Sequence, residues 1–203
     1  MGIALTLSGC GGAGTPDASA HSDSVIKSVD QMRAVMPELV HMPVGWSVMN
    51  GTGVYTAAEV KAMDSCRTNP HCVPGLLFSA VNGYQTEAGD RTAFTASAFD
   101  SPERARKMYD ARIKGWEKAE VPSTALAPIV LPALGDAAGG RWLSSVEEGG
   151  EPARTTCSVE ALVGSVVVSV SCSTSEGRPD PELPVDMTRL IVSRAQQALN
   201  PDT

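Results

Sequence analysis

The feature that most constrains the fold is a pair of β-branched segments, 153–163 and 166–174, separated only by Gly164-Ser165. Two such runs joined by two turn residues predict a β-hairpin. With a two-residue turn, Val163 faces Val166, and residues equally distant from the turn face one another along both strands. The register of this hairpin is therefore predicted residue by residue.

That register places two cysteines opposite each other. Cys157 lies six residues before Val163, and Cys172 lies six residues after Val166, so the two cysteines are expected to face each other. Because side chains alternate between the two faces of a strand, both also fall on the apolar face formed by Val159, Ala161, Val166, Val168 and Val170. The expected Cα separation of about 5.5 Å for a hydrogen-bonded pair lies within disulfide range. We predict a Cys157–Cys172 disulfide, with two buried free thiols as the alternative.

The remaining cysteines divide into a second pair and a single residue. Cys66 and Cys72 enclose a polar loop with a turn at Asn69-Pro70, and we predict a disulfide that clips this small loop. Zinc bound with His71 is the weaker interpretation, because structural zinc sites use closer cysteine spacing and four ligands. Two disulfides indicate an oxidising compartment. Of the five cysteines, only Cys10 is then left without a partner.

Cys10 ends the sequence Leu7-Ser8-Gly9-Cys10, which resembles the bacterial lipobox. That resemblance implies a diacylglycerol on the Cys10 thiol and cleavage just before it. A signal peptide needs an apolar stretch of about 7–15 residues, so we expect the true start to lie upstream or the chain to be shortened. We assign 1–9 as a signal-peptide remnant, 10–23 as a lipidated flexible tether and 24–200 as a single sensor-like domain. A chance match and N-myristoylation at Gly2 are the weaker alternatives.

Hydrophobic periodicity predicts an α+β fold. Strands are expected at 45–48, 76–85, 91–99, 140–146, 153–163 and 166–174, and helices at 24–36, 57–64, 102–118 and 185–199. The 102–118 helix has a clear start, in which Asp100 or Ser101 caps and Pro102 occupies the first turn. We predict an antiparallel sheet of five or six strands with helices packed on one face. The order strand-strand-strand-helix occurs twice, which suggests an internal duplication.

Charge and motif content exclude several functions. A net charge of −7 argues against nucleic acid and anionic membrane surfaces as partners. The histidines are His21, His41 and His71, and none belongs to a metal-binding or catalytic motif; a lone loop histidine is usually solvated. Glu147, Glu148 and Glu151 are interpreted as a solubilising hairpin tip. We therefore predict no catalytic residue, no metal site and no cofactor.

Three tryptophans are the remaining candidates for ligand contact. Trp46 begins a strand, and Trp116 has the helical spacing of a core residue. Trp142, near a sheet edge, and the adjacent Arg141 are the predicted ligand-binding residues.

Three short motifs carry a family resemblance: Pro43-Val44-Gly45-Trp46, the Phe99–Ala105 strand-to-helix junction, and Leu134-Gly135-Asp136-Ala137. They resemble exported sensor-type lipoproteins and the extracellular sensor domain of bacterial receptor Ser/Thr kinases of the PknH type. The resemblance implies a two-disulfide α/β domain with a central cleft. The expected function is a non-enzymatic lipoprotein, anchored by lipid to the extracytoplasmic face of the cell membrane, that binds a small ligand or an envelope protein. A lipid or apolar-molecule carrier, which needs a large apolar cavity, and an envelope hydrolase are the alternatives.

Overall fold

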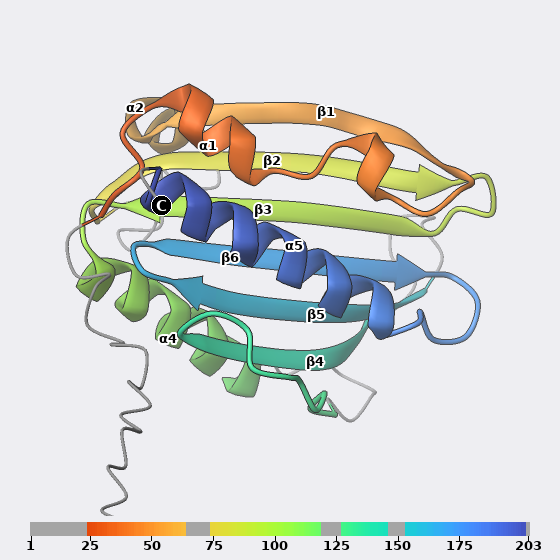
Figure 1. Cartoon of the computed structure of the whole chain (residues 1–203). Helices are drawn as coiled ribbons and strands as arrows, with labels where there is room; N and C mark the ends of the chain where they lie inside the picture. The colour runs from red at the N-terminus through yellow and green to blue at the C-terminus, as the bar shows by residue number, and fades with distance from the viewer. Residues whose placement is uncertain (1–23, 64–73, 119–126, 146–152, 202–203) are drawn as a thin grey trace, which may run out of the picture.

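The computed structural model describes residues 24–63, 74–118, 127–145 and 153–201. Six antiparallel strands form one open sheet in the order β1-β2-β3-β6-β5-β4 (Figure 1). The strands are β1 (Trp46–Thr56), β2 (Leu76–Thr86), β3 (Arg91–Phe99), β4 (Ala137–Ser145), β5 (Arg154–Val163) and β6 (Val166–Thr174). The predicted α+β class and six-stranded antiparallel sheet are confirmed.

The β5–β6 hairpin has the predicted register. Val163 pairs with Val166, and Cys157 pairs with Cys172. Gly164 adopts a positive φ of 51° at the turn, a backbone conformation that glycine accepts without steric cost. The Asp136 carboxylate accepts a hydrogen bond of 2.6 Å from the Gly164 amide and so fixes the turn from outside the hairpin.

Gly135, the residue before Asp136, is required by the close approach of two backbone segments in the Leu134-Gly135-Asp136 motif. The Asp136 amide donates to the Leu162 carbonyl at 2.7 Å, which brings the approach to β4 directly against the end of β5. Gly135 has a φ of 59°, and a Cβ at this position would lie 2.3 Å from the Leu162 oxygen. Only glycine fits that close approach.

Strand β1 is longer than predicted. It covers Trp46–Thr56 rather than 45–48, and its pairing with β2 shifts register between Val48 and Asn50 and again between Asn50 and Gly53. The first irregularity lies at Met49, and the second lies within Asn50-Gly51-Thr52-Gly53, whose residue types are typical of turns. Bulges absorb the extra residues and let the strand continue past them.

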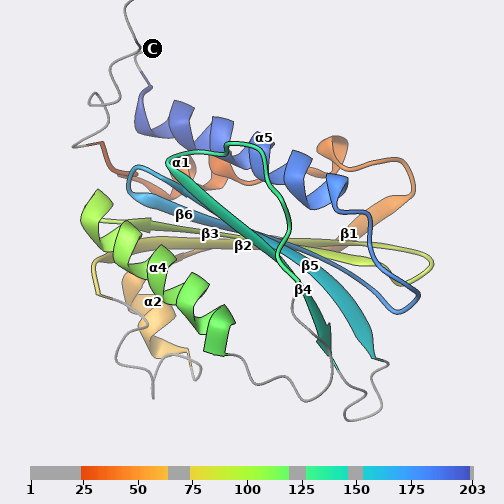
Figure 2. The same cartoon turned by 90° about the horizontal axis from the view of Figure 1, so that it is seen from below.

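Helices cover both faces of the sheet, which corrects the prediction that they pack on one face. The helices are α1 (Val29–Val35), α2 (Ala57–Ala62), α4 (Pro102–Lys118) and α5 (Glu182–Leu199), with a 3₁₀ turn, η1, at Leu39–His41. Figure 2 shows α1 and α5 above the sheet and α2 and α4 below it. The core is accordingly split into a larger cluster under α1 and α5 and a smaller one under α2 and α4.

The physical reason for this double coverage lies in β5 and β6. Val159 and Val168 pack in the larger cluster, whereas Leu162 and Val167 pack in the smaller one. Both faces of these strands therefore carry apolar side chains that must be removed from water. Helix α5 contacts β5 and β6 from one side, and α4 contacts the same two strands from the other.

Local capping sets where these helices begin. The Ser101 hydroxyl accepts from the Arg104 amide at 3.3 Å, as expected for a cap of α4. The Asp180 carboxylate accepts from the Glu182 amide at 2.9 Å at the start of α5. Helix α1 begins at Val29 rather than at residue 24, because the Ser28 side chain caps it by accepting from the Gln31 amide.

Candidate functional site

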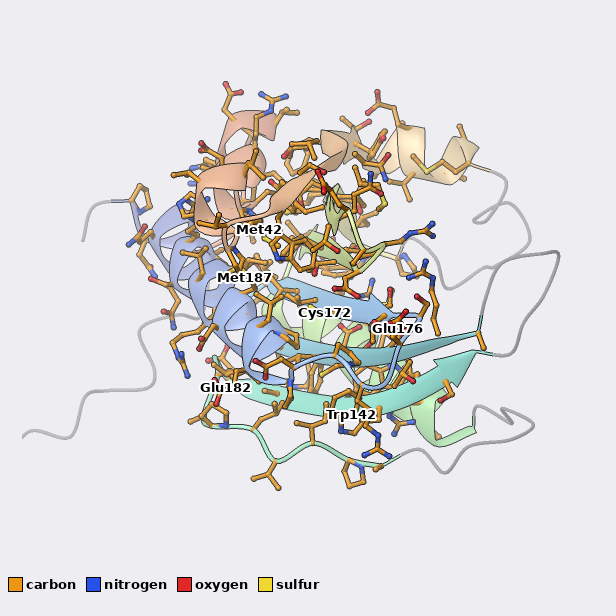
Figure 3. All side chains as sticks on the ribbon, turned by 90° about the vertical axis from the view of Figure 1, so that its right-hand side faces the viewer. Met42, Trp142, Cys172, Glu176, Glu182 and Met187 are labelled. Carbon is orange, nitrogen blue, oxygen red and sulfur yellow. The ribbon has the colours of Figure 1, made fainter. Side chains whose placement is uncertain are left out.

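The candidate site is a cleft of about 290 Å³ at the end of the sheet, beneath the connection 175–181 between β6 and α5. Figure 3 looks onto this end of the molecule. Cys172 lies at its floor, and Trp46 and Leu183 contribute apolar walls. Charged residues from the two neighbouring connections complete the lining: Asp90, Arg91, Glu176, Arg178 and Asp180. An apolar floor with a charged rim is the usual composition of a small-molecule site.

Cys172 and its partner Cys157 are buried free thiols in the structure. The Cys172 sulfur lies 3.2 Å from the Thr92 hydroxyl on β3. Burial raises the pKa of both thiols to about 12, and the nearby Asp180 carboxylate acts in the same direction. Since the thiolate is the reactive form of cysteine, neither sulfur is suited to act as a nucleophile at neutral pH.

Trp142 lies next to this pair, because it is the β4 partner of Cys157. It is half-buried, and the Arg178 guanidinium sits over its ring at 5.6 Å from the centroid. Trp142 therefore belongs to the surroundings of the cleft through Arg178, which lines it.

Arg141 lies on the other side of the sheet. Its guanidinium is 4.9 Å from the centre of the Trp116 ring on α4, the helix that packs against the opposite face. Because consecutive residues of a strand point to opposite faces, the structure does not bring Arg141 and Trp142 into one site. Trp116 is half-buried beneath the Arg141 guanidinium, away from the cleft.

His41 is not simply solvated, as a lone loop histidine was expected to be. It is half-buried, and its Nε2 lies 2.9 Å from the Arg194 side chain on α5. Arginine can only donate, so Nε2 must be the acceptor. Arg194 also donates to the Met36 carbonyl at 2.5 Å, and these contacts tie η1 to α5.

A buried carboxylate, Glu160, was missed by the sequence analysis. It lies on β5 facing α4, with its side chain 7% exposed and 3.2 Å from Arg112. Burial raises the pKa of Glu160, and the Arg112 charge opposes that rise. The only sequence signal was a charged residue inside an apolar strand. It lies on the opposite face from Val159 and Ala161, hence away from the cleft.

A second hollow of about 350 Å³ lies along 129–139 at the approach to β4. It is lined largely by Ile129, Leu131, Pro132 and small residues, and its single carboxylate, Asp136, already holds the hairpin turn. The sheet-end cleft is therefore the stronger candidate.

Other chemistry is limited within the described residues. They contain no group of three or more His, Cys, Asp or Glu side chains placed to hold a metal ion. Among the helices described, none is both long and apolar enough to cross a membrane. The predicted site residues Cys10, Cys66 and Cys72, together with His21, His71 and the acidic tip around Glu147, lie outside the described residues.

Comparisons with known proteins find a likeness to solved structures alone. No known family matches the sequence, and no curated protein matches it. A solved structure that is similar is the extracellular domain of PknH from Mycobacterium tuberculosis. It shares 12% sequence identity with a TM-score of 0.43, over 85% of this chain and 93% of that domain. This is the type of domain that the sequence motifs resemble.

Proposed function

We propose that the chain is a non-enzymatic binding protein of the cell envelope, anchored by lipid on Cys10 at the extracytoplasmic face of the membrane. The observation that carries the binding role is the cleft above Cys172, with Trp46 in its wall and charged groups at its rim. Its volume of about 290 Å³ is at the lower end of the range for small-molecule pockets. A small ligand, or one side chain of an envelope protein, fits that size.

The non-enzymatic role is supported by what the cleft offers chemically. Acyl or phosphoryl transfer needs an activated nucleophile next to a base or a metal. The lining offers the Cys172 thiol and the Ser173 and Thr174 hydroxyls, with no histidine among the described residues beside them to act as a base. Burial raises the pKa of the Cys172 thiol to about 12. The carboxylates of the rim can bind and orient a ligand without supplying such a group.

The location is supported by the cysteines. The lipobox-like Leu7-Ser8-Gly9-Cys10 motif accounts for the fifth cysteine if the other four pair as predicted. Cys157 and Cys172 are direct partners across β5 and β6, a placement that suits a cross-strand disulfide. We accordingly propose that both disulfides, Cys66–Cys72 and Cys157–Cys172, form in an oxidising compartment.

The second candidate function is a carrier of lipid or another apolar molecule. It needs a continuous apolar cavity of several hundred Å³. In the described residues the space between the sheet and α5 is filled by side chains such as Phe94, Val168 and Ile191. That packing favours the binding protein over the carrier.

The anchor is tested by mass spectrometry of the protein extracted from native membranes. We expect an N-terminus at Cys10 that carries a diacylglycerol, and a Cys10→Ser variant that is no longer membrane-bound. An unmodified Cys10 with Met1 still attached would end the lipoprotein proposal.

The cleft is tested by a small-molecule screen that follows the three indole N–H signals in ¹⁵N NMR spectra. Ligands that enter the cleft should shift the signals of Trp46 and Trp142. The Trp116 signal is an internal control, because this ring lies beneath Arg141 on the other side of the sheet. A screen in which no compound moves Trp46 or Trp142 would contradict the binding role.

A further inference from the structure

Beside the cleft, a cation of the protein itself lies over an aromatic ring. The Arg178 guanidinium lies 5.6 Å from the centre of the Trp142 ring. Arg178 is an exposed residue of the connection 175–181, and it also lines the cleft. The indole face is thus covered by a cation that belongs to the protein itself.

The charges around this contact favour a cation over an anion. Three carboxylates line the cleft, from Asp90, Glu176 and Asp180, against the two guanidinium groups of Arg91 and Arg178. If Arg178 moves away, the local balance becomes three negative charges against one positive charge. Negative potential in a confined cleft raises the local concentration of cations.

Resting on the proposed binding function, we propose that a weakly hydrated organic cation, a guanidinium or quaternary ammonium group, binds where the cleft meets Trp142. There it takes the place of Arg178, which lines the cleft and covers the Trp142 ring. Tryptophan is the side chain whose ring attracts such cations most strongly. A small inorganic cation is disfavoured because the described residues hold no metal-binding group of three ligands and because such ions keep their water.

Arg178 acts in this arrangement as an internal competitor. A cation–π contact at an exposed site shifts an equilibrium by a factor of about 2–5. The ligand binds only the fraction of molecules in which Arg178 has left the ring, so its apparent affinity is reduced by that fraction. Removing Arg178 should therefore tighten cation binding about threefold to sixfold.

The test is an NMR titration of the full chain with tetramethylammonium and with N-acetyl-arginine amide, each compared with sodium chloride at equal ionic strength. We expect both organic cations, and not sodium, to shift the Trp142 indole signal and to leave Trp116 unchanged. Arg178→Gln should bind both about threefold to sixfold more tightly. Arg189→Gln is the matched control, because it removes the same charge from α5, where Arg189 is paired with Asp186. It should bind as wild type does.

Trp142→Leu should lose the preference for organic cations over sodium, although Trp142 is half-buried and this variant can fail to fold. The Arg178→Gln result does not depend on it, since Arg178 is exposed. Equal shifts with sodium, or an affinity that Arg178→Gln leaves unchanged, would overturn the proposal. If neither organic cation moves Trp46 and Trp142 but an anionic or uncharged compound of the small-molecule screen does, the cation proposal fails and the binding function stands. If no probe moves them, both fail.

Discussion

Folding should suppress the reactivity of Cys157 and Cys172 in the reduced protein. Burial raises the pKa of both thiols to about 12, whereas an unperturbed cysteine has a pKa of about 8.5. At about pH 7.5 the thiolate fraction then falls from roughly one in ten to roughly one in 30,000. The more basic thiolate is intrinsically more nucleophilic by about 40-fold, from a Brønsted coefficient of about 0.4–0.5. The net expectation is a reaction roughly a hundredfold slower than in the unfolded chain.

The assay is alkylation of reduced protein by iodoacetamide, with and without concentrated urea, followed by tryptic digestion. Both cysteines fall in the single peptide 155–189, because Arg178 is followed by Pro179 and trypsin does not cut there. The modification rate of this peptide should fall roughly a hundredfold on folding. Equal rates in the two conditions would show that the thiols are not held as the structure has them.

The same argument determines when the proposed disulfide can form. Thiols that are unreactive in the folded protein must be oxidised before or while the hairpin closes, since exchange requires a thiolate. A loop of about 15 residues closed by a disulfide is stabilised by about 3 kcal/mol. Peptide 155–189 from exported protein should therefore be lighter by two hydrogens, and oxidised protein should unfold at higher urea than reduced protein. Two intact thiols in exported material would refute the disulfide.

Three further changes test the packing. Because burial raises the pKa of Glu160, its folded form binds more protons than its unfolded form, so this group's contribution to stability falls as pH rises above about 4.5. Glu160→Gln should remove that part of the pH dependence in urea melts, and an unchanged profile would be inconsistent with a buried carboxyl. Phe94→Ala, at a side chain 1% exposed, should lower the free energy of unfolding by about 3–5 kcal/mol in the same assay; a loss below about 1 kcal/mol would contradict the packed core. Asp136→Ala should lower the free energy of unfolding by about 1–2 kcal/mol, because it removes the acceptor of the Gly164 amide. Asp136→Asn keeps an acceptor and should be closer to wild type. Equal losses in the two variants would argue against that hydrogen bond.

The parts of the fold that were predicted well are those specified by local pattern. The two-residue turn at Gly164-Ser165 determines which residues of β5 and β6 face each other, and no distant contact is needed to deduce it. The start of α4 could likewise be predicted from the sequence, because the cap of its first turn is a local contact between Ser101 and Arg104. By contrast, β1 was predicted too short, because Asn50–Gly53 has turn-forming residues and only its pairing with β2 shows that it is bulged strand.

The sequence does contain a pattern that indicates helices on both faces of the sheet. Ala161–Val168 is almost uninterrupted apolar sequence, Gly164-Ser165 excepted, and strands buried on both faces have this pattern instead of alternation. Helices on one face would cover only part of these apolar side chains. Arg141 and Trp142, predicted together as ligand-binding residues, do not share one site for a related reason. They are neighbours in one strand, so their side chains point to opposite faces of the sheet. The cleft itself could not be deduced, because it forms where β1, β3 and the connection after β6 meet.

The repeated order of three strands and a helix is not a repeat of the three-dimensional structure as a whole. A two-fold axis normal to the sheet, between β3 and β6, would superpose β1-β2-β3 on β4-β5-β6. Such an axis leaves each face of the sheet in place, so it would put α4 and α5 on the same side. They pack on opposite sides of β5 and β6. The repeat therefore extends to the strands alone. The helices α4 and α5 therefore cover the β5–β6 hairpin from its two faces, and the cleft lies at the end of β6, where residues 172–174 line it.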